Sequence, residues 1–130
     1  MKTILLVDDS RVTREVLKVY LIPRGVDFLE AVDGADALVR ARTRRPDLVV
    51  ADLRMPKLDG PGLCAAMRAD RALRDVPVII LTGVRDAESA KRCLEAGARE
   101  VLLKPIQPGP LLESVSRYLD ARPSPPGGTP

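Results

Sequence analysis

The sequence contains four short and nearly continuous apolar runs, at residues 4–7, 48–51, 78–81 and 101–103. Continuous rather than alternating hydrophobicity is typical of strands that are covered on both faces, as in a parallel sheet with helices on each side. A fifth segment, residues 27–31, mixes Phe28 and Leu29 with charge and predicts a strand at the edge of that sheet.

Apolar residues at helical spacing lie between and after these runs, so helices are predicted there. Ser10 and Asp33 are suited to cap two of the helices. Gly97 is suited to end a helix, and Pro108 to begin the last one. The stripe predicted for the first helix consists of Val12, Val16, Val19 and Tyr20. A strand followed by a helix, repeated five times, predicts a doubly wound α/β domain.

Length and composition fit one domain with an aliphatic core. The chain has 130 residues, of which 45% are hydrophobic and only 2% aromatic. The net charge of +3 is a mild bias, and the arginines of segment 40–45 are interpreted as a solvated face rather than a nucleic-acid surface. Cys64 and Cys93 have no metal-ligand spacing and are expected to be small buried residues.

The two ends of the chain differ in character. The first apolar run is too short for a signal peptide or a membrane span, so we expect a cytoplasmic protein that does not enter a membrane. Residues 122–130 are rich in proline and glycine and predict a disordered tail or linker, which leaves residues 1–121 as the folded domain.

Reactive side chains follow the predicted strands. Asp8 and Asp9 follow the first run, Asp52 the third strand, Thr82 the fourth and Lys104 the fifth. Because the functional crevice of an open α/β sheet lies at the carboxyl ends of its strands, we expect these side chains to converge.

Three neighbouring carboxylates repel one another, and a bound divalent cation would relieve that repulsion. A set of hard oxygen ligands favours Mg²⁺ over zinc. A carboxylate beside such an ion can attack phosphorus and form an aspartyl phosphate. Lys104 would then neutralise the incoming charge, and Thr82 would donate a hydrogen bond to it. Taken alone, each residue has a purely structural interpretation, as a helix cap, a turn residue or a solvated lysine. The inference of a functional site therefore depends on the whole set.

Five segments of the sequence resemble the receiver domains of two-component response regulators. They are ILLVDDS at 4–10, DLRMPKLDG at 52–60, VIILTG at 78–83, LEAGA at 94–98 and VLLKP at 101–105. Their order and spacing fit from residue 2 to about residue 121. The resemblance implies a flavodoxin-like (βα)5 sheet in the order 2-1-3-4-5 and a phosphorylation-dependent switch that changes its affinity for partners.

The resemblance also implies roles for single residues. Asp52 would be the phosphoacceptor and would bind Mg²⁺ together with Asp9 and the backbone carbonyl of Arg54, whereas Asp8 would act largely through water. Thr82 and Lys104 would hold the phosphoryl oxygens. Gly60 would close the loop that follows Asp52.

Further positions would belong to the switch and its interface: Gly83, Val84, Val101 and Pro105. The Lys104–Pro105 peptide would be cis. The family usually has Tyr or Phe at the position of Val101, and that aromatic side chain swings inward when the threonine moves toward the phosphate. Val101 is not aromatic, so this way of reporting phosphorylation cannot operate here. Arg54 and Val84 occupy the positions where the family tunes the lifetime of the phosphate.

The implied phosphodonor is a histidine kinase or a phosphotransfer protein, and the downstream target is not defined by the sequence. A homodimer through the fourth helix, fifth strand and fifth helix is a further expectation, without direct contact to nucleic acid.

Three alternative functions fit the sequence less well. A phosphatase that uses an aspartyl phosphate would need a second Asp where this chain has Arg54, which cannot donate a proton near neutral pH. A dinucleotide enzyme is disfavoured because Asp8, Asp9 and Ser10 stand where a glycine fingerprint would be needed. A phosphorylation-independent scaffold with the receiver fold would usually lack an acidic residue or the lysine, and this chain keeps both.

Overall fold

Strands and helices alternate along the chain in the computed structural model, which describes residues 1–83 and 87–120. The strands are β1 (Thr3–Val7), β2 (Asp27–Ala31), β3 (Leu48–Asp52), β4 (Val78–Thr82) and β5 (Glu100–Leu103). The helices are α1 (Arg11–Leu21), α2 (Gly34–Thr43), α3 (Gly60–Ala69), α4 (Ala87–Ala96) and α5 (Pro108–Leu119), with a short 3₁₀ turn at Ile22–Arg24. Val84 and the predicted tail at 122–130 lie outside the described residues.

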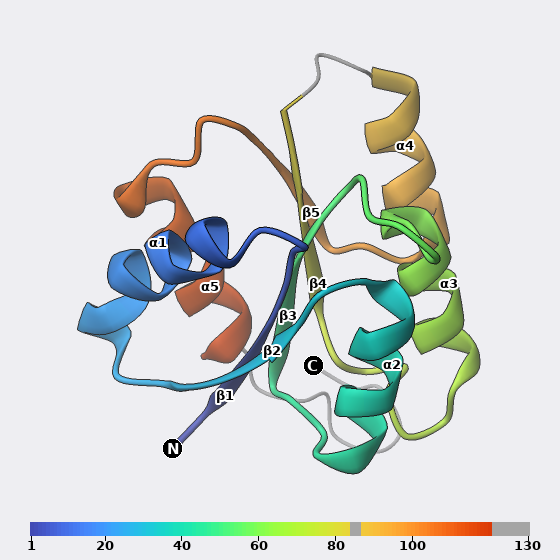
Figure 1. The fold of residues 1–130 in the computed structure, drawn as a ribbon, viewed down its shortest axis with the longest axis horizontal. Coiled ribbons are helices and arrows are strands. Elements are labelled where there is room, and N and C mark those ends of the chain that lie inside the picture. Colours follow the sequence, from blue (N-terminus) through green and yellow to red (C-terminus); the bar gives the residue numbers. More distant parts are fainter. Residues whose placement is uncertain (84–86, 121–130) are drawn as a thin grey trace, which may run out of the picture.

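The strands form one parallel sheet in the order β2-β1-β3-β4-β5, as the family resemblance implies. The segment predicted to be an edge strand is indeed β2 at one edge. Helices α1 and α5 cover one face of the sheet, and α2, α3 and α4 cover the other (Figure 1). The doubly wound architecture predicted from the sequence is therefore confirmed.

The apolar runs are continuous because successive side chains of a strand enter two different cores. In β1, Leu5 and Val7 belong to the core beneath α2, α3 and α4. Ile4 and Leu6 belong to the core beneath α1 and α5. All four side chains are at most 1% exposed. The sheet is therefore shielded from solvent on both faces, and function is left to the loops at its edges.

The first helix buries a different face from the one its valine stripe suggested. Leu17 and Leu21, one turn apart, are buried against the core beneath α1 and α5. Val12, Val16 and Val19 are 73%, 40% and 60% exposed. The stripe correctly predicts a helix, but α1 carries aliphatic side chains on two faces and only the leucine face packs on the sheet. An apolar surface is therefore left open on α1.

The predicted helix boundaries are confirmed at four positions. The side chains of Ser10 and Asp33 cap α1 and α2 by accepting hydrogen bonds from backbone N–H groups three residues later. Gly97 follows α4 with φ = +119°, and Pro108 begins α5. These caps fix where each helix meets the loops at the sheet edges.

Gly34, the first residue of α2, gives a prediction about stability. A Cβ atom at this position would clash with the backbone oxygen of Leu58, in the loop that follows β3. We expect Gly34→Ala to lower the free energy of unfolding by about 1–3 kcal/mol, because the backbone must shift to relieve the clash. Urea unfolding followed by circular dichroism measures the change.

The matched control is Gly109→Ala in α5, where the added Cβ has no atom within 4 Å other than those of its two chain neighbours and the local helix backbone. It should leave stability unchanged or raise it by about 0.4–1 kcal/mol. Equal stabilities for the two variants would show that the contact between α2 and the Leu58 loop is not tight in solution.

Candidate functional site

The carboxyl ends of the strands carry the reactive side chains at one edge of the sheet. Strand β1 ends just before Asp8 and Asp9, and β3 ends on Asp52. These two strands are neighbours, with Val7 paired to Ala51, so Asp8 and Asp52 lie side by side. Strand β4 ends on Thr82, which is paired to Leu103, the residue before Lys104. The predicted convergence is therefore present in the structure.

Lys104 and Asp52 form the central contact of this site. The Lys104 Nζ donates a hydrogen bond of 2.7 Å to Asp52 Oδ1, and the Asp52 side chain is only 14% exposed. The backbone N–H of Lys104 also donates to the carbonyl of Thr82 at 2.7 Å. Gly83 lies against the Lys104 methylene groups. The ends of β3, β4 and β5 are therefore connected through this one lysine.

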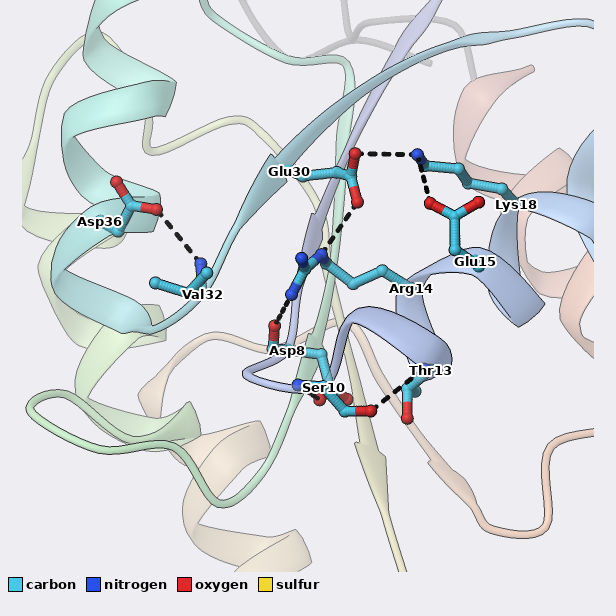
Figure 2. Close-up of polar contacts among 9 residues, drawn as sticks. All are labelled: Asp8, Ser10, Thr13, Arg14, Glu15, Lys18, Glu30, Val32 and Asp36. Carbon is cyan, nitrogen blue, oxygen red and sulfur yellow. Dashed lines mark hydrogen bonds and ion pairs between the residues drawn. The ribbon is translucent and has the colours of Figure 1, made fainter.

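Asp8 is held in place by its surroundings. Its side chain accepts a 2.8 Å hydrogen bond from the backbone N–H of Ser10, and its own N–H donates to the carbonyl of Ala31. Figure 2 shows Arg14 between two acceptors: it donates to the carbonyl of Asp8 at 2.6 Å and to Glu30 at 2.9 Å. The loop between β1 and α1 is therefore held by hydrogen bonds to Ser10, Ala31 and Arg14.

Arg14 and Glu30 were not singled out from the sequence. Arg14 lies in the first turn of α1, four residues after the cap Ser10, and its N–H donates to the Ser10 carbonyl. Glu30 lies on the edge strand β2, where the mixture of charge with Phe28 and Leu29 indicates only an edge. Lys18 also donates to Glu30, at 2.8 Å (Figure 2). The bonds from Lys18 and Arg14 hold the pKa of Glu30 below its ordinary value.

Groups around Asp8 shift the pKa of its carboxyl group in opposite directions. Burial raises the pKa of Asp8 above its ordinary value, and the backbone N–H of Ser10 opposes that rise. The nearby Asp52 and Asp9 carboxyl groups raise this pKa further, whereas Lys104 lowers it. The carboxyl groups of Asp52 and Asp9 thus lie close enough to disfavour the ionised form of Asp8. Such a site is favourable to a bound cation.

The donor chemistry of the site fits a hard divalent cation. Carboxylate oxygens are the ligands that Mg²⁺ prefers, and the sequence has no His to suggest zinc. Within residues 1–83 and 87–120 no group of three His, Cys, Asp or Glu side chains is arranged as a metal-binding set. Asp52 faces Lys104 instead, and Asp8 faces the N–H of Ser10. Binding a cation would therefore require these side chains to turn toward it.

The other predicted positions lie around this centre. Arg54 follows β3 with an exposed side chain, and Gly60 closes the loop by donating its N–H to the carbonyl of Leu53 at 2.9 Å. The Lys104–Pro105 peptide is cis, as expected, and Pro105 is exposed. Val101 is partly buried and packs on the core beneath α2, α3 and α4.

A doubly wound sheet with acidic side chains and a lysine at its carboxyl edge defines a class of α/β signalling domains. Comparison with known proteins specifies the family: residues 4–116 match the response regulator receiver domain. The chain belongs to this family, whose members are phosphorylation-dependent signalling domains of two-component systems.

Curated relatives support the assignment. The chain is 40% identical over 120 residues to a probable transcriptional regulator ycf27 of Porphyridium aerugineum, covering 90% of this chain and 49% of that protein. It is 37% identical over 116 residues to the DNA-binding response regulator MtrA of Mycolicibacterium paratuberculosis, covering 89% of this chain and 50% of that protein. The chain thus spans about half the length of these relatives.

Solved structures agree with the fold. A putative response regulator from Chloroflexus aurantiacus superposes with a TM-score of 0.87 at 31% identity, covering 92% of this chain and 98% of that one. The receiver domain of a sensor histidine kinase from Pseudomonas aeruginosa, solved with a magnesium ion coordinated in its active-site cleft, gives 0.84 at 32% identity over 92% and 98% of the two chains. In the part of the chain described here, no helix is both long and apolar enough to cross a bilayer.

Proposed function

We propose that this domain is a phosphorylation switch in which Asp52 accepts a phosphoryl group beside Mg²⁺. The observation that carries the proposal is the 2.7 Å contact between Lys104 Nζ and Asp52 Oδ1, next to Asp8 at the carboxyl edge of the sheet. A largely buried carboxylate with an adjacent ammonium group is suited to attack phosphorus, because the ammonium can follow the charge onto the new phosphoryl group.

The proposed roles of the residues are those that the resemblance to receiver domains implies. Asp9, Asp52 and the backbone carbonyl of Arg54 would hold Mg²⁺, with Asp8 acting largely through water. The bound ion would neutralise the carboxylates and the transferred phosphoryl group. An Asp52 oxygen would form a bond to phosphorus as the bond to the donor's leaving group breaks. Lys104 would then move from Asp52 onto a phosphoryl oxygen, and the Thr82 hydroxyl would donate to another.

A small phosphodonor tests this function directly. With acetyl phosphate and Mg²⁺, we expect the intact mass of the protein to rise by one phosphoryl group, about 80 Da, as an alkali-labile acyl phosphate. Chelation of Mg²⁺ with EDTA should abolish the labelling. Unchanged labelling in EDTA would contradict the role proposed for the cation. No labelling under any condition would favour the alternative, a phosphorylation-independent scaffold.

The open apolar face of α1 suggests where a protein phosphodonor docks. A groove of about 290 Å³ extends from α1 to the loop after β5 and is lined by Val12, Val16, Tyr20, Lys104 and Ile106, among others. One wall is the exposed valine surface and the other carries the lysine that contacts Asp52. We infer that a histidine kinase or phosphotransfer protein places an apolar surface here while presenting its phosphohistidine to Asp52.

Val16→Arg tests this docking face. Val16 is 40% exposed in the middle of α1, so the substitution should not disturb the core. We expect transfer from a phosphorylated donor protein to fall roughly tenfold or more, because a charge would be desolvated in the apolar interface. Labelling by acetyl phosphate should stay unchanged, since that donor needs no docking surface.

Val39→Arg is the matched control, because Val39 is 61% exposed on α2, on the other face of the sheet. It should alter neither reaction. Equal losses in the two variants would mean that added charge alone impairs transfer, and would remove α1 as the docking face.

The remaining parts of the proposal concern the wider protein. We propose residues 1–121 as the switch domain and residues 122–130 as a tail or linker, in the cytoplasm and outside the membrane. Activation would change affinity for an unidentified downstream partner or for a second copy through α4, β5 and α5. Direct nucleic-acid contact by these residues themselves is not proposed, although the similar MtrA is a DNA-binding regulator.

A further inference from the structure

A second charged pocket lies at the amino ends of the strands, whereas Asp52 lies at their carboxyl ends. It has a volume of about 190 Å³, and three of its lining residues are Arg68, Arg74 and Arg99. Arg68 belongs to the last turn of α3, Arg74 to the segment before β4, and Arg99 directly precedes β5. These are the amino ends of β4 and β5, whereas Asp52 is at a carboxyl end. The pocket is therefore separate from the proposed phosphorylation site.

The three guanidinium groups lack carboxylate partners among residues 1–83 and 87–120. Six of the other arginines in that part of the chain do form ion pairs: Arg14, Arg24, Arg40, Arg42, Arg44 and Arg117. The nearby Asp70 accepts from Arg42 at 2.9 Å and from the backbone N–H of Ala72. Asp70 is engaged in these two bonds and also interacts electrostatically with Arg74. One carboxylate does not balance three guanidinium groups, so the pocket keeps a net positive charge.

Backbone hydrogen bonds position the side chain of Arg68 and the main chain of Arg99. Arg68 donates to the carbonyl of Glu95 at 3.0 Å, and a Cβ on Gly97 would lie 3.4 Å from its Nε atom. The backbone N–H of Arg99 donates to the carbonyl of Val78 at 2.9 Å. A guanidinium group has five N–H donors, so Arg68 keeps most of its donors after this one bond. Such forks match the oxygens of a phosphate group.

The electrostatic balance at this edge favours an anion. The carboxyl ends of α3 and α4 lie here, and each contributes roughly −0.5 of a charge. Three guanidinium groups contribute three positive charges, which exceeds the two helix ends together with the nearby Asp70 carboxylate. Burial raises the pKa of the Cys64 thiol in the pocket lining to about 12, so this thiol is neutral near pH 7. The helix ends and the thiol therefore do not cancel the positive charge.

We propose that this pocket binds a phosphate group, either as free inorganic phosphate or on a small phosphate monoester. Ligand pockets for drug-sized molecules usually enclose about 300–1,000 Å³, so the smaller volume here favours a compact oxyanion over a whole nucleotide. Apolar side chains line part of the pocket, including Met67, Val76 and Val78, and they would restrict water around the bound anion.

The test is an NMR titration of the full chain with inorganic phosphate, and separately with glycerol 3-phosphate, at constant ionic strength. We expect saturable shifts of the Arg68, Arg74, Gly97 and Arg99 amides, with a dissociation constant on the order of 1 mM. Tighter binding of the monoester would identify a small metabolite as the source, and tighter binding of phosphate would identify the free ion. Acetate should not bind, and equal binding of acetate would overturn the phosphate assignment.

Arg74→Gln and Arg99→Gln should each weaken phosphate binding roughly tenfold or more. The matched control is Arg71→Gln, an exposed arginine of the same loop that does not line the pocket. An equal loss in the control, or shifts that never saturate, would overturn the proposal and leave non-specific counter-ion binding. Labelling of the Arg74→Gln/Arg99→Gln double variant by acetyl phosphate should be unchanged, so failure here is distinguishable from failure of the proposed phosphorylation.

Discussion

Asp52→Asn is expected to abolish phosphoryl labelling by acetyl phosphate, with a loss of at least about a hundredfold in the labelled fraction. The amide keeps the shape of the carboxylate but is not a nucleophile toward phosphorus at neutral pH. Asp52 is also the carboxylate that contacts Lys104 at 2.7 Å, so no neighbour has the same electrostatic support. Intact mass spectrometry in the presence of Mg²⁺ measures the labelled fraction.

Asp75→Asn provides the control, because Asp75 is an exposed carboxylate in the loop before β4 and distant from the carboxyl edge of the sheet. It should label like the wild type. Full labelling of Asp52→Asn would refute Asp52 as the acceptor. Peptide mapping of that variant would then show whether Asp8 or Asp9 carries the group instead.

The position of this site follows from the sequence because strand burial and strand ends are local properties. The run at 48–51 is apolar because β3 is covered on both faces, and the next residue, Asp52, necessarily emerges at the carboxyl edge. The same reasoning places Thr82 at the end of β4. Strand order needed the family resemblance in addition, because continuous apolar runs do not specify which strands are neighbours.

Contacts between distant segments could not be predicted in this way. The bond from Arg14 to Glu30 joins α1 to β2, and neither residue lies in a recognisable motif. The valine stripe of α1 was another ambiguity, since Leu17 and Val16 are adjacent in sequence and helical spacing supports either face. Only the packing of α1 on the sheet decides which face is buried. The Arg68, Arg74 and Arg99 pocket likewise depends on how two helix ends and a loop meet.

Lys104 has two contacts that connect Asp52 to the neighbouring strands. Its Nζ bonds Asp52, and its backbone N–H bonds the carbonyl of Thr82. Phosphorylation adds roughly two negative charges at Asp52, which should draw both Lys104 and the Thr82 hydroxyl toward the phosphoryl group. Val101 cannot fill space by swinging, because a β-branched side chain is stiff at χ1. The response should therefore be a displacement of the backbone around β4 and β5.

Lys104→Ala is expected to separate metal binding from this response. Removing a positive charge beside Asp52 should leave Mg²⁺ affinity intact or raise it by up to roughly fivefold, since a partly exposed ion pair contributes up to about 1 kcal/mol. Isothermal titration measures that affinity. Addition of beryllofluoride, a phosphoryl mimic, should shift the amides of Thr82, Gly83 and residues 101–103 in the wild type. The same shifts should be lost in Lys104→Ala.

Asp9→Ala serves as the contrasting variant, because it should weaken Mg²⁺ binding while leaving the bond between Lys104 and Asp52 in place. Retention of the shifts at 101–103 in Lys104→Ala would show that the lysine does not carry the displacement to β5. Wild-type shifts confined to Asp8, Asp9 and residues 52–54 would contradict the mechanism at an earlier step. They would mean that the domain binds the phosphoryl group without transmitting it, since a signal that leaves Asp52 through Lys104 must perturb the strands that this lysine connects.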